Sequence, residues 1–165
     1  VGSVLLGAVL AGFASTTAIW LLLPAFLFVR MALNAIDGML ARQYGQQSAL
    51  GGLLNETGDV ISDAALYLPL ALLPGVQAWM VVAVVLLACL TEFIGVCAVA
   101  IGAARRYDGP MGKSDRAFVL GAAGLALGLG LTPGLWLNVL LGIIAVLLLL
   151  TVVNRARAAL QEVAP

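Results

Sequence analysis

Oxygen-bearing side chains gather at two places within otherwise apolar stretches of the chain. The first holds Asn34 and Asp37, and the second holds Asn55, Asp59 and Asp63. At roughly 100° per helical residue, residues four apart fall on one stripe, so the second group lines one face of a helix. Asn34 and Asp37 are likewise neighbours on one face. Carboxylate and amide oxygens ligate hard cations, and such cations on phosphate oxygens are a standard way to transfer a phosphoryl group.

The remaining composition excludes several other kinds of chemistry. The chain contains no histidine, which excludes Ser-His-Asp and Cys-His catalysis and histidine-ligated metals. Cys89 and Cys97 both lie in one apolar run, so neither a disulfide framework nor a zinc site is expected. Eight basic residues balance eight acidic ones, so no nucleic-acid partner is expected. The oxygen-only ligand set favours Mg²⁺, Mn²⁺ or Ca²⁺.

The elements that must position these residues are membrane helices. Of 165 residues, 63% are apolar and 10% are charged, and the mean hydropathy is +1.13. About 20 apolar residues span a bilayer, so we predict an all-α, integral membrane six-helix bundle formed by one domain over 1–165. A first helix that begins at Val1 without a basic stretch is expected to be truncated. The predicted spans are 1–14, 20–42, 51–73, 78–104, 116–131 and 135–153.

The basic residues and the tryptophans predict the same orientation. Except for Arg30, the basic residues fall at one side of the predicted spans, which should be cytoplasmic. They are Arg42, Arg105, Arg106, Lys113, Arg116, Arg155 and Arg157. Trp20, Trp79 and Trp136 each lie at the opposite end of a span, as an interfacial belt would place them.

Intramembrane acids need a compensating gain, because an Asp at the centre of a span costs about 2.5–3.5 kcal/mol. The short link of residues 43–48 makes the second and third spans antiparallel neighbours, so their polar stripes can meet. Asp37 lies roughly 8 Å, and Asp59 roughly 12 Å, from the cytoplasmic end of its helix. This depth suits a substrate with a lipid tail and a charged head. The alternative is a buried polar network that only holds the helices together.

Two further features leave structural and functional alternatives open. Arg30, Asp63 and Glu92 lie at similar depths and could form charge-neutralising pairs, or Arg30 could hold a substrate phosphate. Gly124 and Gly128 form a G-x-x-x-G pattern in the fifth span. That pattern predicts either a helix-dimer face or close packing within the chain's own bundle.

These residues also match a family pattern. The chain reads Asn34-Ala-Ile-Asp37-Gly38-Met-Leu-Ala41-Arg42, then eight residues, then Gly51-Gly-Leu-Leu-Asn55-Glu-Thr-Gly-Asp59. This resembles the signature of the CDP-alcohol phosphotransferase family, D-x2-D-G-x2-A-R-x8-G-x3-D-x3-D, with every spacing kept. It is most similar to a bacterial branch with Asn at two of the signature Asp positions.

The resemblance implies a reaction and a role for each matching residue. A CDP-linked donor, often CDP-diacylglycerol, would lose CMP as a phosphatidyl or phosphoalcohol group passes to a small alcohol, in phospholipid biosynthesis. Asp59 would be the general base. Asp63 lies one turn beyond it on the same stripe, and this position, not the resemblance, makes it a candidate second base or ligand. The metal ligands for one or two Mg²⁺ or Mn²⁺ ions would be Asn34, Asp37, Asn55 and Asp59. The nucleotide would contact Asn34, Asp37, Gly38, Ala41, Arg42, Gly51 and Lys113. Lys113 and Arg116, in a stretch that resembles a family loop, would contact substrate phosphate. Arg30 is a further candidate for this contact from its depth and charge, not from the resemblance.

The resemblance further implies a homodimer in the bacterial inner membrane, with the site facing the cytoplasm. Asn34 and Asn55 depart from the signature, since amide oxygens carry no charge and the matched ligand set falls from a formal −4 to −2. Either one metal binds, or two bind more weakly, or Asp63 and Glu56 substitute. A non-catalytic relative that binds CDP-lipid is the alternative function, and an ion transporter a weaker one.

Overall fold

The computed structural model of the protein describes residues 1–45 and 48–164, apart from the side chains of residues 41 and 42. Six α-helices and two short 3₁₀ helices form in the described residues, which contain no strand, so the all-α prediction is confirmed. The α-helices are α1 (Gly2–Gly12), α2 (Leu22–Gln43), α3 (Ala49–Tyr67), α4 (Ala78–Ala100), α5 (Lys113–Gly128) and α6 (Leu135–Glu162). The 3₁₀ helices are η1 (Thr17–Leu21) and η2 (Leu68–Leu72).

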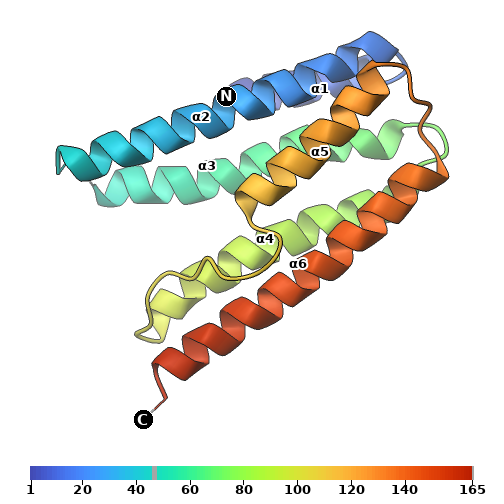
Figure 1. The fold of residues 1–165 in the computed structure, drawn as a ribbon. Helices are drawn as coiled ribbons and strands as arrows, with labels where there is room; N and C mark the ends of the chain where they lie inside the picture. Colours follow the sequence, from blue (N-terminus) through green and yellow to red (C-terminus); the bar gives the residue numbers. More distant parts are fainter. Residues whose placement is uncertain (46–47, 165) are drawn as a thin grey trace. The chain divides into compact units, whose positions relative to one another are not determined.

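The chain divides into two compact units, which are described separately. Unit 1 consists of Val1–Pro69 and Ala117–Thr132, and unit 2 of Leu70–Arg116 and Pro133–Pro165. Unit 1 therefore contains α1, α2, α3 and most of α5, whereas unit 2 contains α4, α6 and the first residues of α5 (Figure 1).

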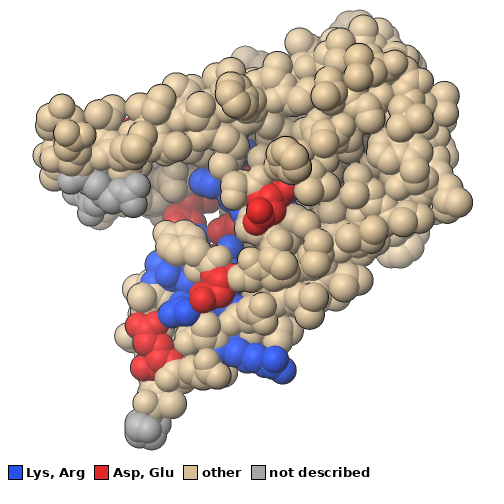
Figure 2. Space-filling model, in the orientation of Figure 1, with Lys and Arg blue, Asp and Glu red and all other residues tan. Residues whose placement is uncertain are grey.

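Among the described residues, three helical stretches are long and apolar enough to cross a membrane. They are Thr17–Leu40, Ala78–Ala100 and Leu135–Glu162. The other helices are shorter, as α1 and α5 are, or carry several acids, as α3 does. That these three also cross the membrane stays a prediction. Most of the surface seen in Figure 2 carries no charged side chain, as a lipid-facing surface requires.

Some helix ends differ from the predicted span ends for identifiable reasons. α6 continues to Glu162 instead of ending near residue 153, because the residues that follow are mostly good helix formers. α4 ends at Ala100, ahead of the predicted 104, and Gly102 there adopts a φ of +92°, which a glycine reaches without strain.

Small residues let the helices of unit 1 approach closely. A Cβ on Gly7 of α1 would collide with the main-chain carbonyl of Ala65 in α3. A Cβ on Gly124 would lie 3.0 Å from a side-chain carbon of Leu23, and one on Gly128 would lie 2.6 Å from a side-chain carbon of Leu21. The G-x-x-x-G face of α5 is therefore used for packing within the unit, which was one of its two predicted uses.

The two helices of unit 2 lie side by side and run in the same direction (Figure 1). At their starts, Asn138 accepts a hydrogen bond from the Gln77 amide at 2.9 Å and donates one to the Gly75 carbonyl at 2.8 Å. At their ends, Glu162 accepts from the Ala104 amide at 3.0 Å. These polar contacts at both ends fix the register of α6 along α4.

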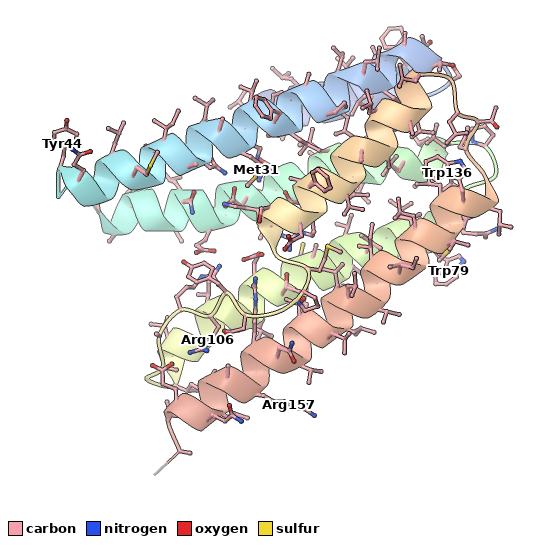
Figure 3. The ribbon with its side chains drawn as sticks, viewed as in Figure 1. Met31, Tyr44, Trp79, Arg106, Trp136 and Arg157 are labelled. Atoms are coloured by element: carbon pink, nitrogen blue, oxygen red, sulfur yellow. The ribbon has the colours of Figure 1, made fainter. Side chains whose placement is uncertain are left out.

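The aromatic and basic residues of unit 2 lie towards opposite ends of its helices. Figure 3 shows Trp79 and Trp136 at the starts of α4 and α6, with Arg106 and Arg157 towards the opposite end. Trp20 of unit 1 differs, because its indole is buried and donates to the Ala14 carbonyl at 3.0 Å. Two of the three tryptophans thus lie as an interfacial belt would place them.

Candidate active site

Asp59 is the centre of a polar cluster that joins α2 and α3 within unit 1. The Arg30 guanidinium donates from Nη2 to Asp59 Oδ1 at 2.9 Å and from Nη1 to Asp63 Oδ1 at 2.8 Å. Nη2 also donates to the Asp59 carbonyl at 3.3 Å. All three residues are largely buried, with Asp59 at 8% and Asp63 at 4% exposure. The predicted pairing of Arg30 with Asp63 is therefore confirmed, and Arg30 bridges two acids of one stripe.

Asn34 joins the part of the signature on α2 to the part on α3 by a hydrogen bond. Its amide Nδ2 donates to Asp59 Oδ1 at 3.3 Å. A carboxylate in this position could not donate, so the amide allows the two signature residues to approach each other without a cation between them. The prediction that the polar faces of α2 and α3 meet holds for this pair.

The other two predicted ligands lie closer to the link between α2 and α3. Asp37 and Asn55 are both exposed. Within the described part of the chain, no three acidic or cysteine side chains gather into a metal-binding group. Two of the four predicted ligands are asparagines, so only Asp37 and Asp59 of the set carry a charge. The assignment of Asn34, Asp37, Asn55 and Asp59 as a ligand set stays a prediction.

The chemistry of this donor set still fits a hard divalent cation. It consists of carboxylate and amide oxygens only, which Mg²⁺ and Mn²⁺ accept. Asp59 and Asn34, from the two halves of the signature, come from α3 and α2, with the Asn34 amide nitrogen facing Asp59. The set therefore offers oxygen ligands from two adjacent helices.

Glycines keep the backbone beside this cluster accessible. A Cβ on Gly38, Gly52 or Gly58 would meet no described atom within 4 Å. A Cβ on Gly51 would lie 3.0 Å from the Ser48 hydroxyl, which accepts from the Gly51 amide and caps the start of α3. Open backbone is what a nucleotide pocket needs here. The side chains of Ala41 and Arg42 lie outside the described residues.

Unit 2 contains a second buried cluster, centred on Glu92 of α4. Its carboxylate accepts from Arg116 at 3.0 Å, from Arg105 at 2.9 Å and from Arg155 at 3.3 Å. Arg116 and Arg155 are each only 1% exposed. Arg116 also donates to the Thr91 hydroxyl at 3.2 Å. Glu92 thus pairs with arginines of its own unit. One of them is Arg116, which was predicted to contact substrate phosphate and instead forms an ion pair with Glu92.

The loop between α4 and α5 is fastened to α6 beside this cluster. Arg155 donates to the Asp108 carbonyl at 3.2 Å, and the Met111 amide donates to the Thr151 hydroxyl at 3.0 Å. Arg106 donates to Glu162 at 2.7 Å and to Asp108 at 2.8 Å. The hydrogen bond from Arg106 lowers the pKa of Asp108 below its usual value. Figure 2 shows acidic and basic atoms side by side over this loop and the end of α6.

Lys113, the remaining predicted phosphate contact, begins α5 and is partly exposed. The Gly112 amide before it donates to Asp115 at 2.8 Å, which caps the helix. Sequence reasoning missed the roles of Arg155 and Thr151. An isolated acid in an apolar helix signals that a partner is needed, but which arginine provides it depends on how α4 and α6 pack.

Comparison with known proteins bears directly on this arrangement. Residues 1–153 match the model of the CDP-alcohol phosphatidyltransferase family. The chain belongs to this family. Over 156 residues it is also 50% identical to the inner membrane protein YnbA of Escherichia coli (strain K12). The matched residues make up 94% of this chain and 78% of that protein. No solved structure matches the chain significantly.

Membership of the CDP-alcohol phosphatidyltransferase family assigns the general reaction class. The protein is a transferase of phosphatidyl groups from CDP-alcohols, working in a membrane environment. The family is generally dependent on divalent metals, which agrees with the oxygen-only donor set of α2 and α3.

Proposed function

We propose that the protein transfers a phosphatidyl group from CDP-diacylglycerol, or a phosphoalcohol group from another CDP-linked donor, to a small alcohol, releasing CMP, in phospholipid biosynthesis. The observation that carries this is the contact between Asn34 and Asp59, the first and last residues of the signature, on two different helices. Both lie in a unit that is otherwise largely apolar. A lipid donor with a charged head matches that combination.

In this proposal Asp59 accepts the proton of the acceptor hydroxyl. The hydroxyl oxygen forms a bond to the phosphorus next to the diacylglycerol, and the bond to CMP breaks. A bound Mg²⁺ or Mn²⁺ would neutralise phosphate charge, held by oxygens drawn from Asn34, Asp37, Asn55 and Asp59. Arg30 fixes the position of Asp59, since it donates to both the carboxylate and the main-chain carbonyl. The contact of Lys113 and Arg116 with phosphate stays a prediction.

We further propose a multi-pass protein of the bacterial inner membrane, with its site facing the cytoplasm. The name of the similar E. coli protein and the three apolar helices support the location. The basic residues at one end of α4 and α6, opposite Trp79 and Trp136, support the orientation. A homodimer is expected from the family resemblance.

The experiment is a CMP-release assay with the full chain in detergent–lipid micelles. Wild type should release CMP from CDP-diacylglycerol only when the right acceptor is added, so a panel of polyols, polyol phosphates, serine and choline identifies it. Asp59→Asn should lower the rate by about 10²–10⁴-fold, the usual contribution of a general base. Glu162→Gln makes the same acid-to-amide change far along the chain and should keep the rate. Full activity of Asp59→Asn would refute the assigned base.

The two asparagines favour one other candidate, a relative that binds CDP-lipid without turning it over. Asn34 donates to Asp59 instead of adding a negative charge, so the cluster has less charge than the signature provides. Tight CDP binding with no CMP release from any donor and acceptor pair would support this candidate.

A further inference from the structure

The Arg30 guanidinium contacts the carboxylate of Asp59, which the family signature assigns to the metal site. Nη2 is 2.9 Å from Asp59 Oδ1, and Nη1 is 2.8 Å from Asp63 Oδ1. The Arg30 side chain is 9% exposed, so the positive charge is held inside the unit between two acids. Neither Arg30 nor Asp63 belongs to the signature, and each lies one helical turn beyond it. The polar cluster therefore continues one helical turn beyond the signature on both helices.

Asn34 changes what the same carboxylate can bind. Two carboxylates at positions 34 and 59 would repel each other unless a cation lay between them. The amide of Asn34 instead donates to Asp59 Oδ1, the oxygen that also accepts from Arg30. A divalent cation at this oxygen would have to displace both donors and to approach a positive guanidinium. At Asp59 Oδ1 the protein itself already supplies one cationic donor and one amide donor.

We propose that Arg30 takes the place of a second metal ion at Asp59, so that the site binds at most one divalent ion, towards Asp37 and Asn55. This inference rests on the proposed function and defines its metal requirement. The formal charges of the three residues in contact agree with it. Asp59 and Asp63 contribute −2 and Arg30 contributes +1, which leaves −1. A dication added at these oxygens would turn this into +1 in a largely apolar unit.

The test counts the Mn²⁺ ions bound to the full chain in detergent, without nucleotide. Equilibrium dialysis with metal analysis gives the number per chain, and electron paramagnetic resonance shows whether bound ions are coupled to each other. Wild type should bind one ion, with the spectrum of an isolated Mn²⁺. Arg30→Leu removes the internal cation from two buried acids and should bind one ion more. Two coupled ions in wild type, or an unchanged number in Arg30→Leu, would overturn the proposal.

Two control variants separate this charge effect from general damage. Arg30→Lys keeps a cation beside Asp59 and should bind as many ions as wild type. Arg157→Gln removes an exposed arginine of α6 and should also leave the number unchanged. If Arg30→Leu does not fold, the count and spectrum of wild type still decide, because a coupled pair refutes the proposal. A chain that gains one ion in Arg30→Leu but never releases CMP would support this inference while refuting the proposed transfer.

Discussion

Neutralising Glu92 tests the buried cluster of unit 2. In Glu92→Gln, three arginines that donate to one carboxylate keep their charges while the negative charge of that carboxylate disappears. Removing one partner from a buried ion pair typically costs about 3–5 kcal/mol, because the remaining charge is left without compensation. At roughly 2–4 °C per kcal/mol for a chain of this size, the melting temperature should fall by about 6–20 °C.

Thermal unfolding of the full chain in detergent, followed by tryptophan fluorescence, measures this change. Glu162→Gln is the matched control, because Glu162 also pairs with an arginine but its side chain is 40% exposed. An exposed ion pair contributes about 0–1 kcal/mol, so this variant should melt within about 4 °C of wild type. Equal shifts in the two variants would refute the reasoning that burial makes the Glu92 pairs important.

Two further predictions concern glycines whose neighbours leave no room for a side chain. Gly109 has a φ of +118°, and a Cβ there would lie 2.7 Å from the Thr151 Cα. Gly102→Ala, with open space around it, should lose only the roughly 1–2 kcal/mol that backbone strain costs. Gly109→Ala should lose more stability than this, because its Cβ would also collide with Thr151. Equal melting temperatures for these two variants would contradict the close approach. Gly128→Ala should destabilise the protein more than Gly12→Ala, because only a Cβ on Gly128 would collide with Leu21. Thermal melts followed by circular dichroism compare the two variants. A smaller loss of stability in Gly128→Ala than in Gly12→Ala would contradict this packing.

Local periodicity and charge were sufficient to predict the helices and the central pairing of unit 1. The four-residue spacing of Asp59 and Asp63 placed both acids on one stripe, where Arg30 contacts them. The short link after α2 was sufficient to bring Asn34 to Asp59. These contacts could be predicted because they join helices that follow each other directly in the sequence.

The contacts of unit 2 depend on tertiary packing and could not be predicted in this way. Arg155 and Glu92 are 63 residues apart, and their contact requires the parallel alignment of α4 and α6. The sequence showed that Glu92 needed a cation, but five arginines follow it, two in the loop, one in α5 and two in α6. The close approach of Gly109 to Thr151 has no sequence signal, because an isolated glycine in a loop fits many conformations.

The most direct test of the account is the metal dependence of CMP release. The full chain, freed of metal with EDTA and supplied with CDP-diacylglycerol and its acceptor, should release no CMP. Added Mg²⁺ or Mn²⁺ should restore release, and the restored activity should require Asp59. Undiminished release of CMP in EDTA would contradict a site in which oxygens of α2 and α3 hold a divalent ion on the substrate phosphates.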